Sequence, residues 1–157
     1  MATGTPATKL LTSAGVVYKE HEYAHDPNST SFGLEAAEKL GFDPSRVFKT
    51  LIANVDETFA VAIVPVSKQV SLKSLSRTLG AKRAIMADPV QAARLTGYVV
   101  GGISPLGQKR LLATVIDQSA KNFETILVSG GRRGFDIELD PEKLAELLSA
   151  VFAEIAS

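Results

Sequence analysis

Two apolar segments that only two residues separate constrain the fold of this chain most strongly. Val47–Val55 and Thr58–Pro65 are both rich in β-branched side chains, and Asp56-Glu57 connects them. A connection this short returns the chain antiparallel to itself, so the two segments are predicted to form a β-hairpin. Another pair of predicted strands, Thr125–Ser129 and Phe135–Leu139, is joined by a glycine-rich loop.

Helical segments lie between the predicted strands. Polar residues that can cap a helix stand at most of their starts, and Gly, which adopts the left-handed conformation readily, ends most of them. The predicted helices run from Thr5-Pro6 to Gly15, Glu35 to Gly41, Ser71 to Gly80, Asp88-Pro89 to Gly97, and from Asp140-Pro141 at helical spacing through Ile155. Further strands are predicted at Val16–Tyr23 and Leu111–Ile116. Hairpins mixed with helices predict an α+β fold and argue against a doubly wound parallel sheet.

The composition predicts one globular domain over residues 1–157, with 45% apolar and 22% charged residues. The chain has no Cys, which excludes disulfides and zinc–thiolate sites, and its two His cannot form a His-rich metal site. No apolar run reaches membrane-spanning length and no signal-peptide pattern is present, so a cytoplasmic protein without a membrane partner is expected.

The formal net charge is zero, with 17 basic and 17 acidic residues. This balance argues against a protein that grips long nucleic acids by charge alone.

Two glycine-rich segments are the first candidates for a functional site. In Gly97–Gly107 an apolar run gives way to Gly101-Gly102 and then to Ser104-Pro105, and the second segment is Ser129–Asp136. Adjacent glycines let backbone N–H groups approach an anionic or carbonyl group without an intervening Cβ. The alternative is that both segments are tight turns between elements of secondary structure.

Lys49 is the most unusual charged residue, because it lies in a predicted central strand with apolar side chains on both faces. A lysine there needs a partner or must reach a pocket, since an unpaired buried charge is costly. Asp136, just after the second glycine segment, is a candidate partner that would keep the ammonium charged. The alternatives are a lysine that extends from the strand end into solvent and an exposed strand carboxylate.

Other polar residues give weaker signals. His25 lies in a polar loop where Asp26-Pro27 favours a turn. Basic residues occur in the pairs Lys82-Arg83, Lys109-Arg110 and Arg132-Arg133. These pairs are either phosphate contacts around a pocket or an ordinary solvated surface.

Six motifs together point to a known family. They are Tyr23-Ala24-His25-Asp26-Pro27, Phe32-Gly33, Val47-Phe48-Lys49-Thr50-Leu51, Met86-Ala87-Asp88-Pro89, the segment 96–107 and the segment 129–138. In this combination and order, which spans nearly the whole chain, the sequence resembles the YbaK/EbsC proteins and within them the Cys-tRNA(Pro) deacylase branch. These are trans-acting aminoacyl-tRNA deacylases related to the editing domain of bacterial prolyl-tRNA synthetase.

The resemblance implies a mixed, barrel-like β-sheet flanked by helices, and it implies roles for single residues. Lys49 matches a lysine that the family needs for activity, and Gly101 matches a glycine whose N–H faces the substrate carbonyl. Pocket positions are matched by Tyr23, Phe32, Thr50, Ser129 and Asp136. We also expect substrate contacts from the neighbouring glycine-segment residues Gly102, Ile103, Ser104, Gly130 and Gly131. No cofactor and no metal are implied.

The activity that the resemblance implies is hydrolysis of the ester in mischarged Cys-tRNA(Pro), at the 3′ end of the tRNA. The substrate's own thiol would attack the ester, which fits the lack of an evident enzyme nucleophile. Prolyl-tRNA synthetase is the expected partner in a ternary complex. The alternatives are a deacylase for Ala-tRNA or another small amino acid, a non-catalytic module that binds aminoacyl-tRNA or a synthetase, and a small-molecule hydrolase.

Overall fold

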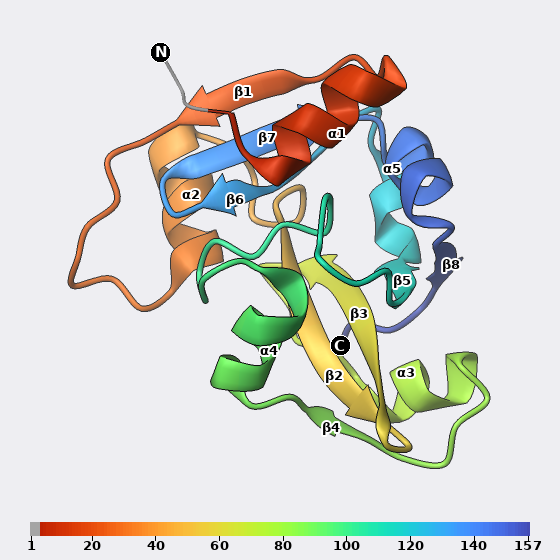
Figure 1. Cartoon of the computed structure of the whole chain (residues 1–157). Helices are drawn as coiled ribbons and strands as arrows, with labels where there is room; N and C mark the ends of the chain where they lie inside the picture. The colour runs from red at the N-terminus through yellow and green to blue at the C-terminus, as the bar shows by residue number, and fades with distance from the viewer. Residues whose placement is uncertain (1–3) are drawn as a thin grey trace.

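The computed structural model describes residues 4–157, and it confirms the α+β class. Figure 1 shows the arrangement of the helices and strands. In chain order they are α1 (Pro6–Ala14), β1 (Lys19–Glu22), α2 (Phe32–Leu40), β2 (Phe48–Val55), β3 (Thr58–Pro65), α3 (Leu72–Thr78), β4 (Ala84–Met86), α4 (Pro89–Thr96), β5 (Ala113–Asp117), the 3₁₀ helix η1 (Gln118–Asn122), β6 (Ile126–Arg132), β7 (Phe135–Leu139), α5 (Pro141–Leu148) and β8 (Val151–Ala153).

The strands form two sheets. One has the order β1-β7-β6 and is antiparallel, and the other has the order β4-β2-β3-β5-β8. The predicted β2–β3 hairpin is confirmed, with Phe48 opposite Pro65 and Val55 opposite Thr58. Asp56 and Glu57 both have positive φ, at 47° and 70°. Two such residues in a row give the turn a twist that matches that of the flanking strands.

The two sheets do not close into a barrel, which corrects the expected barrel-like sheet. They are joined by one parallel bridge, between Val47 and Leu127. Closure requires continuous pairing around the whole sheet. β2 leaves β6 after this bridge, and β4 pairs with β2 only from Ala53 to Val55. Residues 48–52 therefore have no strand partner on one edge, which opens a gap between the two sheets.

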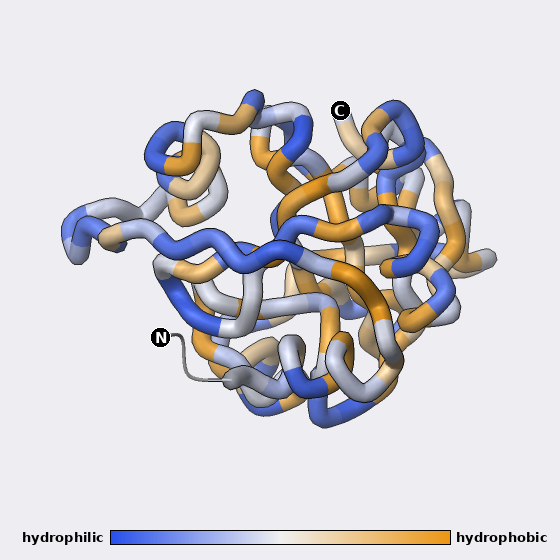
Figure 2. The backbone as a smooth tube through the Cα atoms, turned by 90° about the horizontal axis from the view of Figure 1, so that it is seen from above, coloured by the Kyte–Doolittle hydropathy of each residue, from blue (hydrophilic) through white to orange (hydrophobic). Residues whose placement is uncertain are grey.

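Apolar side chains fill the space between the sheets. The main core cluster combines Phe135 and Ile137 of β7 with Ile63 of β3 and Ile116 of β5, all without solvent exposure. A smaller cluster packs the Ala36-Ala37 pair of α2 onto Val47 and Leu127 at the junction of the sheets. Figure 2 shows β1, whose residues are mostly exposed, as a hydrophilic stretch across the near face.

The last predicted helix is too long, because α5 ends at Leu148. Ser149 takes a positive φ of 50°, and Val151–Ala153 then form β8 beside β5. The Asp117 carboxylate explains this path, since it accepts hydrogen bonds from the N–H groups of Ile155 and Ala156 at 2.9 and 3.0 Å. The apolar residues between positions 144 and 155 therefore belong first to a helix, which ends at Leu148, and then to the strand Val151–Ala153.

The remaining boundaries differ less from the prediction. α2 begins at Phe32, three residues before the predicted start at Glu35. β4 and η1 were not predicted, because three and five residues are too few to show a periodic pattern. None of the helices in residues 4–157 combines the length and the apolar character needed to cross a bilayer.

Candidate active site

A cavity of about 400 Å³ lies at the unpaired edge of β2. Residues 48–52 form one wall, and the start of α2, the segment from β4 into α4 and the loop at Val100–Ile103 contribute the others. Eight of the residues predicted for the site line this cavity: Tyr23, Phe32, Lys49, Thr50, Gly101, Ile103, Ser129 and Asp136.

The alternation of β2 explains how Lys49 reaches the cavity. Val47 packs against α2, while Phe48 and Ile52 belong to the core between the sheets. Side chains alternate along a strand, so Lys49 lies on the same face as Val47, toward α2. Burial lowers the pKa of the Lys49 ammonium below its usual value. No acidic side chain of residues 4–157 forms an ion pair with it.

The main chain of Thr50 faces the open edge of the sheet. The C=O of Val47 accepts from Val66 on the β3 side, and the C=O of Ile52 accepts from Ala87 on the opposite side. Because these directions alternate, the N–H and C=O of Thr50 point away from β3, into the gap before β4. The hydroxyl of Thr50 is also buried without a hydrogen-bond partner in the described chain. Such groups are costly unless a ligand meets them.

Asp136 places a carboxyl group on the same cavity wall. The residue stands opposite Ser129 in the β6–β7 register and is only 6% exposed. Burial raises its pKa to about 7. Tyr23 and Asp136 line the same cavity, and burial, followed by the charge of Asp136, raises the pKa of the Tyr23 phenol to about 12.

The predicted ion pair between Lys49 and Asp136 is not formed in the described structure. Both side chains line the cavity, but their pKa values shift through burial alone, without an effect of a neighbouring opposite charge on either. They come from different sheets, β2 and β7, across the gap that the single Val47–Leu127 bridge leaves open. The cavity therefore offers an ammonium and a carboxyl that are both free to meet a ligand.

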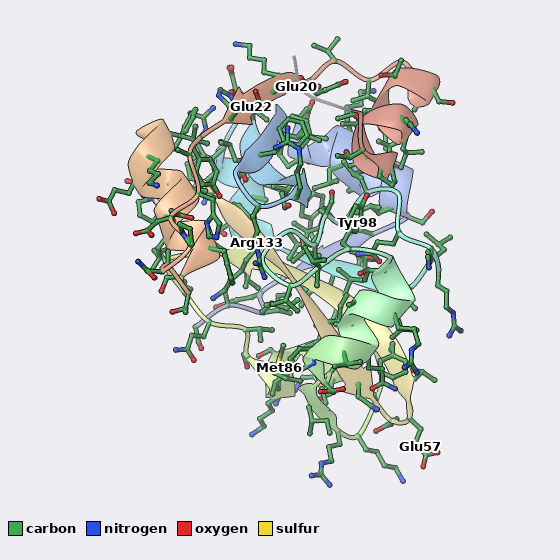
Figure 3. All side chains as sticks on the ribbon, turned by 60° about the vertical axis from the view of Figure 1, so that its left-hand side comes forward. Glu20, Glu22, Glu57, Met86, Tyr98 and Arg133 are labelled. Atoms are coloured by element: carbon green, nitrogen blue, oxygen red, sulfur yellow. The ribbon has the colours of Figure 1, made fainter. Side chains whose placement is uncertain are left out.

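Gly101 forms part of the rim together with two side chains. Its φ is +88°, and a Cβ at this position would stand 2.8 Å from the Phe32 ring. The guanidinium of Arg133 lies 4.8 Å from the centroid of the same ring. It also donates to the C=O of Val100, from Nε at 2.9 Å and from Nη2 at 2.7 Å. A basic residue of the second glycine segment thus holds the first segment in place. Figure 3 labels Arg133 among the side chains of the molecule.

The backbone N–H groups of Gly101 and Gly102 differ in their hydrogen bonding. Gly102 donates to the C=O of Val99 at 2.9 Å, whereas the N–H of Gly101 has no acceptor within residues 4–157. Of these two groups, only the N–H of Gly101 is available to a ligand. The orientation of this N–H toward a substrate carbonyl stays a prediction.

Four residues predicted to bind substrate are not part of the cavity lining: Gly102, Ser104, Gly130 and Gly131. Gly102 packs against the backbone of Arg132. The Ser104 hydroxyl is fully buried and accepts from the N–H of Leu106 at 3.2 Å. Gly130 packs on the Phe135 ring, and Gly131, with φ +111°, packs on Tyr98. Their small size serves the packing of the two segments against each other.

His25 does not line the cavity but fixes the loop that precedes α2. Its Nδ1 lies 2.6 Å from Glu35 Oε1, and the N–H of Asp26 donates to Oε2 at 2.7 Å. Burial alone would raise the pKa of Glu35, but these hydrogen bonds and the one from Lys39 lower it. His25 is thereby a positioning residue for the loop that leads to Phe32.

Several lining residues were not assigned to the site from the sequence. They are small or apolar, such as Gly33 of α2, Met86 of β4 and Ala92 of α4. Gly33 and Met86 each had one usable signal, their places in the Phe32-Gly33 and Met86-Ala87-Asp88-Pro89 motifs. For Gly33 the structure explains it, because a Cβ there would collide with Val66. Ala92 carries no chemical group that distinguishes it from a core residue.

The fold and the cavity define a small α+β domain that presents an ammonium, a carboxyl and free main-chain groups to a ligand. No His lines the cavity and the chain has no Cys, so the lining offers no nucleophile with a histidine base. The sequence model of the aminoacyl-tRNA editing domain matches residues 26–147. This chain belongs to the aminoacyl-tRNA editing domain family.

Individual relatives agree with this assignment. EbsC of Enterococcus faecalis (strain ATCC 700802 / V583), named as a candidate Cys-tRNA(Pro)/Cys-tRNA(Cys) deacylase, is 36% identical over 98% of this chain and 93% of its own. A proline–tRNA ligase of Thermosipho melanesiensis is 26% identical over 74% of this chain, which corresponds to 20% of the ligase. The fold matches a crystal structure described as a candidate trans-editing enzyme for prolyl-tRNA synthetase, with a TM-score of 0.83, 22% identity and 99% coverage of both chains.

Proposed function

We propose that this protein is a trans-acting deacylase that hydrolyses the ester of mischarged Cys-tRNA(Pro). The observation that carries the proposal is the cavity that combines Lys49 and the free N–H of Gly101. Membership of the editing-domain family supports the reaction class, and the relative named as a Cys-tRNA deacylase supports the amino acid.

The Gly101 N–H is the proposed oxyanion donor. Attack on the ester carbonyl moves negative charge onto the carbonyl oxygen, and a fixed donor aimed at that oxygen stabilises the transition state more than the ground state. The positive φ of Gly101 and its packing on Phe32 fix the direction of the N–H before the substrate arrives. Lys49 adds a positive charge in the same cavity, where low polarity strengthens its field.

The nucleophile is proposed to be the substrate's own thiol. The sulfur attacks the carbonyl carbon, the bond from that carbon to the ribose oxygen breaks, and the ribose oxygen takes up the proton that the thiol lost. The product is a four-membered cyclic thioester, which water opens to cysteine. Ser31 and Ser129 line the cavity, but no His does.

This chemistry also selects the amino acid. A pocket separates side chains that differ by one small group by only about 1–3 kcal/mol. Alanine lacks a nucleophile, and the serine hydroxyl is far less acidic than a thiol, so both would be cleaved slowly even when bound. Reactivity then supplies discrimination that fit alone does not.

The test is deacylation of tRNA(Pro) carrying Cys, Ala or Ser, with Lys49→Ala as the control variant. Rapid loss of Cys alone supports the thiol mechanism. Cleavage of Ala at a rate close to that of Cys would establish the broader small-amino-acid deacylase instead. No turnover of any aminoacyl-tRNA, with binding retained, would establish a binding module and end the catalytic proposal.

We further propose that prolyl-tRNA synthetase presents the tRNA to this protein. The support is the formal net charge of zero, which provides little attraction for a tRNA body, together with relatives in which a domain of this kind is part of proline–tRNA ligase. The cavity would then read only the aminoacylated 3′ end.

A further inference from the structure

The charges of the cavity suggest which chemical group its carboxyl receives. Lys49 is the basic residue of the lining and Asp136 is its acidic residue. Neither is paired within residues 4–157. A buried carboxylate without a partner is unfavourable, so a ligand that brings a cation to it gains binding energy.

The position of Asp136 relative to Lys49 is set by the strands. β2 and β6 run parallel at the Val47–Leu127 bridge, so Lys49 and Ser129 both follow two residues later on the same face. Asp136 stands directly opposite Ser129 on β7. The ammonium, the hydroxyl and the carboxyl therefore follow one another across the cavity wall, with the carboxyl at the end away from β2.

An aminoacyl ester carries charges that complement this arrangement. Its ammonium is attached to the carbon next to the ester carbonyl, and its phosphate groups lie on the ribose side. Lys49 cannot attract a cation, which leaves Asp136 as the anionic group of the cavity. A carbonyl bound beside Lys49 and Gly101 would present its α-ammonium toward the carboxyl end of this row.

We propose that Asp136 binds the α-ammonium of the substrate, so that the substrate class is restricted to α-aminoacyl esters with a free amino group. The inference rests on the proposed function. A hydroxyl or an acylated nitrogen in place of the ammonium leaves the carboxylate without its counter-charge. A tRNA that carries a peptide or another N-acylated residue is thus excluded by charge and not only by size.

The experiment compares two esters of the same shape. Wild-type protein is given tRNA(Pro) charged with cysteine or with 2-hydroxy-3-mercaptopropanoate, which keeps the thiol and replaces only the ammonium by a hydroxyl. We expect kcat/KM to be about 100-fold lower for the hydroxy ester, as is typical when a buried charged group loses its partner. The same pair is then measured with Asp136→Asn, and with Asp43→Asn in an exposed turn as the matched control.

Each result has a definite meaning. In Asp136→Asn, kcat/KM for the cysteine ester should fall while that for the hydroxy ester changes less than about threefold, which brings the ratio near one. Equal cleavage of both esters by the wild type, or an equal loss on both in the variant, overturns the inference. Because the wild-type comparison needs no variant, misfolding cannot obscure it. Absence of turnover on both esters ends the proposed function and, with it, this inference.

Discussion

Lys49 shows how far a single residue can be interpreted from the sequence. Its place between apolar neighbours predicts a lysine that must reach a partner or a pocket, and the structure places it in the cavity. The predicted partner is wrong, because Asp136 lies across the gap between the sheets and does not pair with it. Alternation along a strand is a local property, whereas the distance between two strands depends on how far the sheets close.

Removing the ammonium of Lys49 should disable the reaction and leave the fold intact. Lys49→Met keeps the length of the aliphatic stem and removes the charge, so we expect kcat/KM on Cys-tRNA(Pro) to fall by about 100-fold or more. Single-turnover deacylation measures this loss. Lys143→Met is the control, since Lys143 lies on the exposed face of α5, where it contacts Glu146, and does not line the cavity. A Lys49→Met variant with wild-type rates and an unchanged thermal midpoint would contradict the assigned role.

The titration of Asp136 should be visible in the pH dependence of stability. Burial raises its pKa to about 7 in the folded protein, while an unfolded Asp titrates near ~3.9. Between these two pH values the Asp136 carboxyl is protonated in the folded state and ionised in the unfolded state. Its contribution to the free energy of unfolding therefore falls as the pH rises toward 7 and is constant above that. Asn does not titrate. From pH 5 to pH 8 the free energy of unfolding of Asp136→Asn should therefore rise by about 2–3 kcal/mol relative to that of the wild type.

Urea unfolding at both pH values measures this difference. Asp43→Asn controls for a general effect of removing an acidic side chain, since Asp43 is exposed and bonded only within its own turn. If the stability difference between Asp136→Asn and wild type is the same at pH 5 and pH 8, the carboxyl is not the buried, titrating group that the structure describes.

At the scale of the elements, patterns with a local cause were predictable and those with a distant cause were not. The β2–β3 hairpin follows from a two-residue turn, and α1 follows from the capping box of Thr5 and Thr8. The strand β8 depends instead on Asp117, which holds the chain about 38 residues downstream through the N–H of Ile155. Four of the predicted site residues failed to reach the cavity for a related reason. The sequence identifies a glycine loop but does not show which of its faces packs on a neighbouring segment.

Arg133 connects the two glycine segments, and its geometry should matter more than its charge. Arg133→Lys keeps the charge but loses the planar pair of donors to the Val100 C=O. We expect about a tenfold loss in kcat/KM from the displaced Gly101 loop, with little loss of stability because the bonds are exposed. If Arg133 instead served a phosphate through its charge, Arg133→Lys would retain most of the activity. Steady-state deacylation decides between these results.

Arg132→Met is the matched control for this prediction. Arg132 is the adjacent basic residue, but its guanidinium pairs with Glu22 of β1 at 2.6 Å and contributes nothing to the cavity lining. Its removal should leave kcat/KM within about twofold. Equal losses in the two variants would mean that the whole turn, and not the contact to Val100, supports the site.

For the whole molecule, the balance of charge constrains how the tRNA is captured. With 17 basic and 17 acidic residues, the chain has no net attraction for a polyanion, and two of its arginines are occupied by Glu22 and Val100. In the proline–tRNA ligases a related segment makes up about a fifth of the chain, so there it is covalently joined to the rest of the ligase. A tether of this kind supplies an effective concentration that a separate protein lacks.

The separate protein should therefore bind tRNA(Pro) weakly alone and at least about tenfold more tightly when prolyl-tRNA synthetase is present, because two linked contacts replace one. Fluorescence anisotropy of labelled Cys-tRNA(Pro), measured with Lys49→Met to prevent turnover, reports both affinities. A synthetase for another amino acid is the control and should give no gain. The salt dependence provides a second check: few phosphate contacts predict a shallow slope for the protein alone. Tight, tRNA(Pro)-selective capture by the isolated protein would mean that the charged side chains are arranged to read the tRNA body, and no presenting partner would be required.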